Sequence, residues 1–301
     1  GPTDPPAART AIPPGATRRC GPTPLSRAGR RFAPFRTMTE TAISGRPLRR
    51  VEHHLGTAIS LATQDADEAV ANRFFARVAS YELLFSRYLV GSEISRLARG
   101  ELELDAAAPE VREVLTRCEQ LRTLTRGCFD HRGGRELDPN GLAKGWIIQR
   151  STLVFPLAGV TSFFVNAGGD ILVGDAPPGR DGWRVGVRHP DHADAAVAVL
   201  DLERTAIATS ATYERGDHIR PARTAAGSRS VGVPLMSVSV VGPDLGVADA
   251  LATAVHASGD DRPSWWGSAR GYDVLTVAAD RRVRWTSGLD GRIVEVGQSG
   301  G

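Results

Sequence analysis

The sequence predicts an α+β protein in which a helix-rich part packs on a mostly antiparallel, β-rich part. Three observations support this fold class. Apolar residues recur at helical spacing through the first half, and short β-rich runs separated by Gly, Pro and Asp follow in the second half. Strict alternation of strands and helices, typical of a doubly wound sheet, is missing. With 301 residues, 41% of them hydrophobic, the chain can bury a substantial core.

The first 45 residues differ in composition from the rest. They are rich in Pro, Arg, Ala and Gly, with little apolar periodicity, which predicts a disordered segment. The opening Gly1-Pro2 resembles a protease-tag scar and Met38 a natural start, so this segment is either native or an added extension. We expect the folded domain to span residues 51–298.

Charge is distributed unevenly along the chain. Residues 1–50 contain ten arginines and two acidic residues, whereas the remainder contains 27 basic and 32 acidic residues. The folded part is therefore mildly acidic, which argues against a nucleic-acid-binding protein despite the overall net charge of +3.

Residues 51–154 are expected to be mainly helical. A strand is predicted at 55–62 and a short one at 102–104. Helices are predicted at 67–89 with acidic residues in the first turn, at 92–99 with Ser92 as cap, from Pro109 to about 126 with Gly127 ending it, and from Asn140 or Gly141 to about 154.

The rest of the chain is expected to be mainly β-structure. Strands are predicted at 161–166, 171–173, 183–187, 196–202, 205–209 and 236–241. A helix is expected at 248–256, and residues 274–278 and 283–285 are expected to form a closing hairpin.

Composition also excludes some classes of site and location. The three cysteines, Cys20, Cys118 and Cys128, form no CxxC pair, which argues against a disulfide framework or a zinc site. No run of about 18 apolar residues is present, so we expect no membrane span. The N-terminus lacks the apolar region of a secretion signal, so a cytoplasmic protein is expected.

The segment 138–146 is the first candidate for chemistry. A turn containing Gly141 leads into a helix N-terminus, where free N–H groups and the helix dipole favour a phosphate. Lys144, the one lysine of the chain, adds a positive charge one turn later. The alternative is a capped helix with a surface lysine.

Two β-rich segments supply further candidates. In Asn166-Ala-Gly-Gly-Asp170, two glycines allow close approach of a ligand, and Asp170 is suited to bind a ribose hydroxyl or adenine nitrogen; a plain β-turn is the alternative. Thr209 and Ser210 precede His218, a combination suited to acid–base chemistry, but no GxSxG elbow surrounds Ser210 and a polar loop is the alternative.

The segment 248–253 contains a potential cation site. Asp249 and Thr253 are four residues apart and therefore share one helix face. A carboxylate and a hydroxyl form a partial oxygen shell of the kind Mg²⁺ uses together with water and substrate phosphates. The alternative is that Asp249 caps a helix.

Taken in order, these segments resemble the motifs of the ApbE-type flavin transferases, over about three-quarters of the chain. The resemblance is carried by seven ordered blocks: 55–57 (family MGT), 85–97 (FSxY…SEISRLN), 127–130 (GxFD), 138–145 (DLGGIAKG), 166–170 (NxGGD), 208–210 (ATSG) and 248–253 (ADALAT). Seven blocks at the family's spacing are specific, although each alone is not.

The resemblance implies an FAD:protein FMN transferase that splits FAD, attaches FMN to a Thr or Ser hydroxyl of an acceptor flavoprotein and releases AMP. It implies an FAD cleft between the helix-rich and β-rich parts. Mg²⁺ would be bound by the Gly141 carbonyl, Asp249, Thr253 and the FAD pyrophosphate. The family's catalytic groups would be Lys144, Asp249 and His218, the last as general base. The implied FAD contacts are Leu55, Tyr88, Asp138, Asn140, Gly141, Lys144, Gly169, Asp170, Thr209 and Ser210.

The chain departs from the family pattern at several positions. Ala98 replaces the Asn after SRL, Leu55 replaces the opening Met, and Ala211 replaces the Gly of TSG. The segment 218–221 is one residue shorter than the family's HIxDP and lacks its Asp. Two other functions therefore stay open: an FAD pyrophosphatase that releases free FMN and AMP, and a flavin-binding protein without transfer activity.

Overall fold

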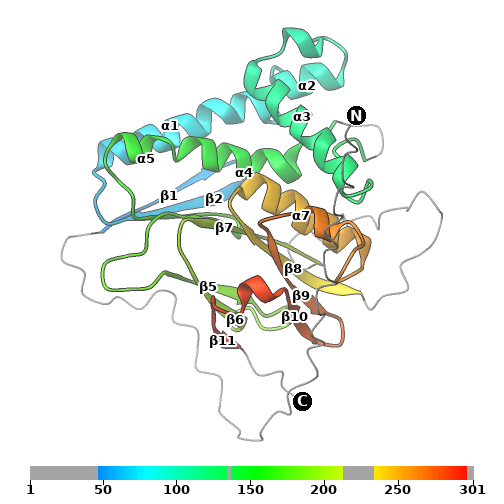
Figure 1. The fold of residues 1–301 in the computed structure, drawn as a ribbon. Helices are drawn as coiled ribbons and strands as arrows, with labels where there is room; N and C mark the ends of the chain where they lie inside the picture. Colours follow the sequence, from blue (N-terminus) through cyan, green and yellow to red (C-terminus); the bar gives the residue numbers. More distant parts are fainter. Residues whose placement is uncertain (1–46, 134–136, 213–233, 297–301) are drawn as a thin grey trace, which may run out of the picture. The chain divides into compact units, whose positions relative to one another are not determined.

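The computed structural model describes residues 47–133, 137–212 and 234–296, all within one compact unit, Pro34–Gly301. The predicted disordered segment 1–45 lies outside these residues. The described part confirms the α+β class, with a large antiparallel sheet, a small one and several helices (Figure 1).

Antiparallel pairing joins all neighbouring strands in the two sheets. The eight-stranded sheet has the order β1-β2-β3-β4-β7-β8-β9-β10, and the three-stranded sheet has the order β11-β6-β5. The strands are β1 (Leu48–His54), β2 (Thr57–Thr63), β3 (Phe163–Ala167), β4 (Asp170–Val173), β5 (Trp183–Arg188), β6 (Ala196–Leu202), β7 (Thr205–Ala211), β8 (Leu235–Gly242), β9 (Asp273–Ala278), β10 (Val283–Trp285) and β11 (Ile293–Val296).

Three helices begin where the local sequence supplies a capping side chain or a proline. The Asp67 side chain accepts a hydrogen bond from Val70 N at the start of α1, and Ser92 does the same from Ser95 N at the start of α2. Pro109 occupies the first turn of α3, where its missing N–H costs nothing. The helices are α1 (Glu68–Phe85), α2 (Glu93–Ala98), α3 (Pro109–Leu124), α4 (Asn140–Ser151), α5 (Val154–Leu157) and α7 (Leu245–Ser258), with 3₁₀ turns η1 (Leu104–Ala106), η3 (Trp266–Ser268) and η4 (Ser287–Leu289).

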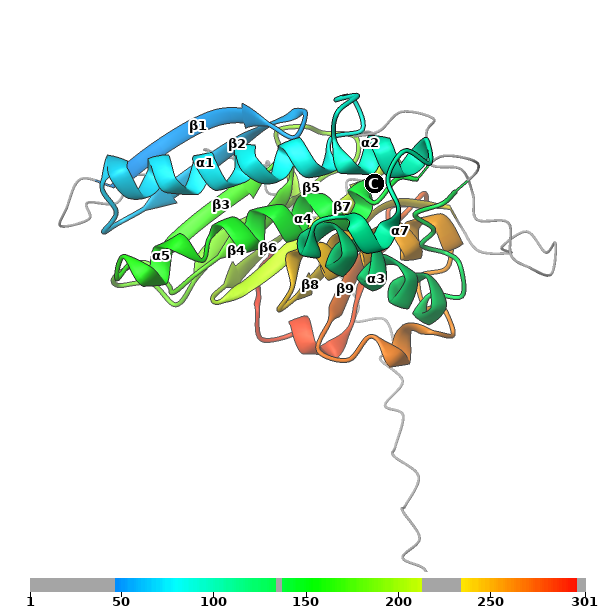
Figure 2. The ribbon, with the colours of Figure 1, turned by 90° about the horizontal axis from the view of Figure 1, so that it is seen from above.

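The large sheet is buried on both faces by different partners. Along β7, Ala206 and Ala208 belong to the core under the helices, whereas Ile207 between them belongs to a second core against the small sheet. This alternation follows from the two-residue period of a strand. Helices α1, α4 and α7 therefore cover one face, and β5, β6 and β11 lie against the other (Figures 1 and 2).

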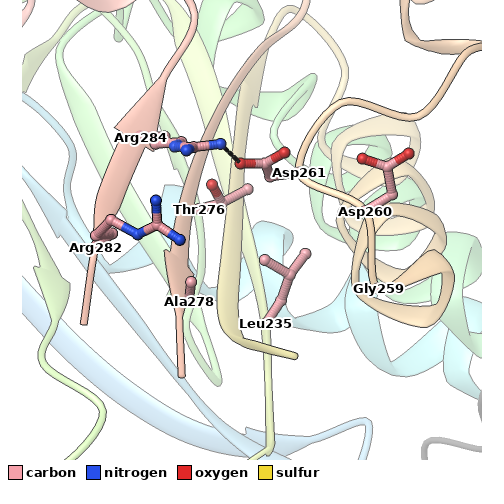
Figure 3. A pocket seen from close by; sticks show the side chains of 8 residues that line it. All are labelled: Leu235, Gly259, Asp260, Asp261, Thr276, Ala278, Arg282 and Arg284. Atoms are coloured by element: carbon pink, nitrogen blue, oxygen red, sulfur yellow. Dashed lines mark hydrogen bonds and ion pairs between the residues drawn. The ribbon is translucent and has the colours of Figure 1, made fainter. Parts of the chain in front are cut away.

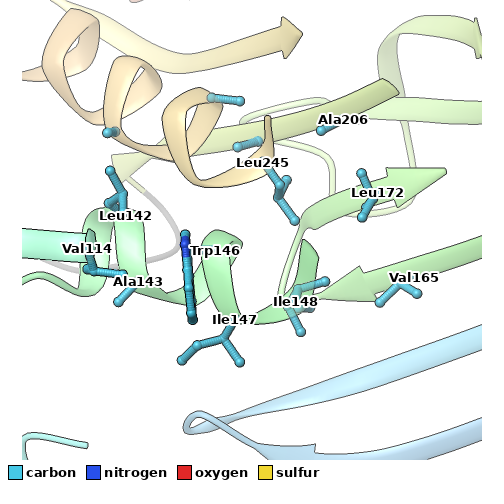
Figure 4. Packing of buried hydrophobic residues seen from close by; sticks show 14 of the residues in the cluster. Val114, Leu142, Ala143, Trp146, Ile147, Ile148, Val165, Leu172, Ala206 and Leu245 are labelled. Atoms are coloured by element: carbon cyan, nitrogen blue, oxygen red, sulfur yellow. The ribbon is translucent and has the colours of Figure 1, made fainter. Parts of the chain in front are cut away.

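Helices α4 and α7 approach each other closely through two glycines. A Cβ on Gly145 would lie 2.6 Å from Leu245 C and Gly246 N, and a Cβ on Gly246 would lie 2.8 Å from Leu142 O. Leu142, Trp146 and Leu245 pack around this crossing (Figure 4). The crossing brings two polar side chains together, Lys144 of α4 and Asp249 of α7.

Several predicted elements have different boundaries. The expected strand 55–62 is β2, and Leu55 lies instead in a turn after β1, a strand the sequence analysis did not predict. The strand predicted at 102–104 is wrong: η1 follows there, with Leu104 exposed. The first long helix ends at Phe85, since Ser86 is extended, and β11 was not predicted.

Candidate functional site

Strand register brings distant motifs to one end of the large sheet. Ala167 pairs with Ile59, so the β3–β4 turn lies beside the β1–β2 turn. Ile171 pairs with Ile207, which places the carboxyl end of β7 beside the start of β4. The segments around Leu55, Asp170 and Ser210 therefore meet at this end.

Lys144 contacts two carboxylates from other elements. Its Nζ is 2.5 Å from Asp170 Oδ2 on β4 and 3.8 Å from Asp249 Oδ2 on α7. The side chains of Asp170 and Asp249 are 1% and 0% exposed, and that of Lys144 is 22% exposed. The surface-lysine interpretation of Lys144 is therefore wrong, and three motifs separated by up to about a hundred residues form one charged cluster.

The helix-cap interpretation of Asp249 is also wrong. Asp244 is the N-cap of α7, and its Oδ1 accepts from Val247 N at 2.9 Å. Asp249 lies in the second turn of the helix, and its buried carboxylate faces Lys144. Thr253, one turn later, has its Oγ1 3.2 Å from Ser210 Oγ, within hydrogen-bond distance. The face of α7 that carries Asp249 and Thr253 thus points to the end of β7.

The start of α4 lies next to Thr253. A Cβ placed on Gly141 would be 3.9 Å from Thr253 Oγ1 and 3.1 Å from the Phe129 ring, so a glycine keeps this approach open. Asp138 Oδ1 accepts from Asn140 N at 3.1 Å and so organises the turn before the helix. The other Asp138 oxygen pairs with Arg87 from the α1–α2 connection.

The β3–β4 turn is a two-residue hairpin turn with both glycines at positive φ. Gly168 has φ 62° and Gly169 has φ 97°, and Gly169 N donates to Asn166 Oδ1 at 2.9 Å. A Cβ on Gly168 would lie 2.6 Å from Thr57 Oγ1, so the two neighbouring turns touch there. The turn fixes Asp170 directly after it, as the first residue of β4.

Thr209 contacts the charged cluster through its backbone N–H. Its N–H donates to Asp170 Oδ1 at 3.4 Å, and its hydroxyl lies 2.8 Å from Ser239 Oγ on β8. Thr209 therefore joins the charged cluster as a donor to Asp170.

Leu55 and Tyr88 lie on segments at the rim of this region. Leu55 has φ 55°, an uncommon conformation for a non-glycine residue, and its N–H donates to Glu82 Oε1 at 2.8 Å. Tyr88 is 91% exposed, so in the described structure it is not packed into a pocket. His218 lies outside the described residues.

Two residues of this region were missed by sequence reasoning. Glu82 on α1 holds the turn of Leu55, and Arg87 joins the α1–α2 connection to Asp138. Arg87 lies within the motif block 85–97, so its position in that block was a signal available in the sequence. Its partner, Asp138, was not. Glu82 gave none, because its partner is a backbone N–H set by tertiary packing.

The two thiols in the described part of the chain are unsuited to nucleophilic catalysis. Cys118 and Cys128 are free, and burial raises the pKa of the Cys118 thiol to about 12 and raises that of Cys128 as well. Both thiols are therefore protonated near neutral pH, whereas the reactive form of a cysteine is the deprotonated thiolate.

The donor set fits a hard divalent cation with few protein ligands. Residues 47–133, 137–212 and 234–296 contain no cluster of three or more His, Cys, Asp and Glu able to bind a metal. Asp249, the Thr253 hydroxyl and the nearby Gly141 backbone are instead oxygen donors of the kind Mg²⁺ accepts. Two carboxylates beside one ammonium also leave a formal negative charge for a cation to balance.

A pocket of about 170 Å³ lies at the C-terminal end of α7 (Figure 3). It is lined by Gly259, Asp260 and Asp261 on one side and by residues of β8, β9 and β10 on the other. Arg284 and Asp261 pair across it at 2.5 Å. None of the predicted site residues lines it.

No helix in the described ranges is both long and apolar enough to cross a membrane.

Comparison with known proteins identifies the family. The ApbE family model matches residues 55–134 and 131–276. A protein named FAD:protein FMN transferase from Treponema pallidum is 28% identical over 62% of this chain and 59% of its own length. One of the same name from Rhodobacter capsulatus is 33% identical over 42% of this chain and 25% of its own length.

The fold agrees with a solved member of the family. The structure named flavin transferase ApbE from Vibrio cholerae superimposes with a TM-score of 0.70, covering 82% of this chain and 99% of that one, at 18% identity. The matches to the two curated relatives span 59% and 25% of their lengths. Since the family model matches well over half of the sequence, the chain belongs to the ApbE family.

Proposed function

We propose that this chain is a Mg²⁺-dependent FAD:protein FMN transferase. The observation that carries the proposal is the convergence of Lys144, Asp170, Asp249 and Thr253, from three motif blocks, at one end of the sheet. The names of the two curated relatives support the same activity. The acceptor would be a protein with an accessible Thr or Ser hydroxyl.

Asp249, Thr253 and the Gly141 carbonyl would hold Mg²⁺ together with the FAD pyrophosphate. When bound, the cation supplies charge neutralisation on the pyrophosphate oxygens. The start of α4 supports phosphate binding, since the positive end of the helix dipole favours an anion there. Asp138 and Asn140 would line this end of FAD, and Leu55, Tyr88, Gly169, Thr209 and Ser210 would surround the rest.

In the reaction, the acceptor oxygen attacks the phosphorus of the FMN half. The bond from that phosphorus to the bridging oxygen breaks, and AMP leaves with the bridging oxygen. Lys144 would stabilise the negative charge that develops on the phosphate oxygens. His218 would take the proton from the acceptor hydroxyl as general base. The product is a phosphoester between FMN and the protein side chain.

The test is incubation of the chain with FAD and Mg²⁺, with and without an acceptor peptide, followed by mass spectrometry. Transfer adds the mass of FMN to the peptide, releases AMP and stops with EDTA. Free FMN and AMP with no labelled peptide would indicate the pyrophosphatase instead. Intact FAD in every sample would indicate a flavin-binding protein and contradict the proposal.

Substitution of Lys144 tests the electrostatic role. Lys144→Ala removes a positive charge held beside the buried carboxylates, so we expect FMN transfer to slow by roughly 100-fold. Initial rates of AMP release at saturating FAD give this value. A rate equal to wild type would mean that Lys144 only balances the charge of Asp170 and Asp249.

Substitution of His218 tests the general base. His218→Ala should slow transfer by roughly 100-fold or more, with the thermal midpoint of unfolding unchanged. His192, on the β5–β6 connection, supplies the matched control, because His192→Ala leaves the proposed site intact. Wild-type transfer by the His218 variant would assign the base to another group.

A further inference from the structure

The charged cluster contains one ammonium and two buried carboxylates, and the two distances are unequal. Lys144 Nζ lies 2.5 Å from Asp170 Oδ2 and 3.8 Å from Asp249 Oδ2. The first contact is a close ion pair and the second is a longer one. Of these two carboxylates, Asp170 therefore lies closer to Lys144 and attracts it more strongly.

Asp170 is fixed in place by three features. It is the first residue of β4, directly after the two positive-φ glycines of the turn. Its Oδ1 accepts the N–H of Thr209 from the neighbouring strand at 3.4 Å. Its side chain is 1% exposed, so it has little room to rotate. A fixed carboxylate gives the flexible lysine side chain a defined position.

We propose that Asp170 is a positioning residue that holds Lys144 away from Asp249 and so keeps the Asp249 carboxylate available for Mg²⁺. The inference rests on the metal assignment in the proposed function. It changes the role of Asp170 from the FAD contact implied by the family resemblance to a partner of Lys144. Without the charge of Asp170, Asp249 becomes the nearest carboxylate, and Lys144 competes there with the cation.

Asp170→Asn isolates this effect. Asn has the shape of Asp and retains an oxygen to accept the Thr209 N–H, whereas the atom opposite Lys144 changes from a charged acceptor to an uncharged NH2 donor. We expect the apparent Kd for Mg²⁺ to rise about tenfold, as is usual when a group that orients metal ligands is removed. Lys144→Met/Asp170→Asn, which has no competing ammonium, should return to the wild-type Kd or below.

The measurement is the thermal midpoint of the full chain as a function of Mg²⁺ concentration, without FAD. A cation that binds the folded state raises the midpoint, and the concentration dependence gives the apparent Kd without any turnover. Asp175→Asn is the matched control, because Asp175 pairs with Arg204 beyond the far end of β4. Lys144→Met alone should bind Mg²⁺ at least as tightly as wild type.

Two results would overturn the inference. An unchanged Kd in Asp170→Asn would show that Lys144 does not compete for Asp249. A double variant as weak as Asp170→Asn would make Asp170 itself a cation ligand. If Asp170→Asn does not fold, the Lys144→Met variant tests the inference by itself. Weaker Mg²⁺ binding by Lys144→Met than by wild type would contradict competition between Lys144 and Mg²⁺ for Asp249. A wild-type chain that binds Mg²⁺ but transfers no FMN contradicts the proposed function and leaves this inference standing.

Discussion

Asp249→Ala is expected to reduce Mg²⁺-dependent cleavage of FAD by roughly 1,000-fold or more, because metal neutralisation of a phosphate transition state is worth several kcal/mol. Asp249 is the fully buried carboxylate on the face of α7 that also carries Thr253. Its loss leaves Lys144 paired with Asp170, so no ammonium loses all of its counter-charge. The variant should therefore fold while losing activity.

Asp244→Ala is the matched control on the same helix. Asp244 caps α7 and pairs with Arg117 at 2.6 Å, so its loss should cost about 1 kcal/mol of stability. It contacts none of the proposed site residues, and transfer should continue. With the thermal midpoints measured without Mg²⁺, the two variants should thus differ: Asp249→Ala loses activity and keeps its midpoint, whereas Asp244→Ala keeps activity and has a lower midpoint. Unchanged AMP release by Asp249→Ala would contradict the metal assignment.

Local signals predicted much of the fold. Asp67 and Ser92 mark helix starts through contacts within one turn, Pro109 does so through its fixed backbone angle, and α1, α2 and α3 begin at these positions. Strand 196–202 was predicted with its observed limits, since its residues other than Asp201 are β-branched or apolar and are bounded by turns. Such elements depend on their own sequence and could be predicted from it.

Two strands were not predicted, for different reasons. β1 is an edge strand with alternating exposure, and its charged residues Arg49, Arg50 and Glu52 gave no apolar run. β11 forms by pairing with β6, almost a hundred residues earlier in the chain. The residues of β11 contain no signal for that distant partner, whereas β1 pairs with the adjacent β2 and was missed because of its charged residues.

The candidate site also combines features that the local sequence predicts with features that only the tertiary structure determines. The Lys144, Asp170 and Asp249 motifs were each identified in the sequence, but each had a plain structural alternative. Their pairing follows from strand register and from the α4–α7 crossing, neither of which a local pattern encodes. The FAD cleft and the individual FAD contacts stay predictions.

Gly145→Ala tests whether that crossing builds the site. The added Cβ would lie 2.6 Å from backbone atoms of Leu245 and Gly246, which cannot rotate away as a side chain could. The helices must therefore separate. Overpacking of this kind costs about 1–3 kcal/mol, and the better helix propensity of Ala offsets up to about 1 kcal/mol. The thermal midpoint should fall by several degrees.

The same displacement should reduce FMN transfer more than the stability loss explains. Lys144 precedes Gly145 on α4, and Asp249 lies one turn after Gly246 on α7, so separation of the helices lengthens the 3.8 Å contact between them. A misplacement of about 1 Å can cost roughly 100-fold in rate. Gly267→Ala is the control, because a Cβ there meets nothing within 4 Å. If Gly145→Ala transfers FMN at the wild-type rate at a temperature where it is folded, the close crossing serves stability alone, and the site geometry is set by the sheet through Asp170 and Ser210.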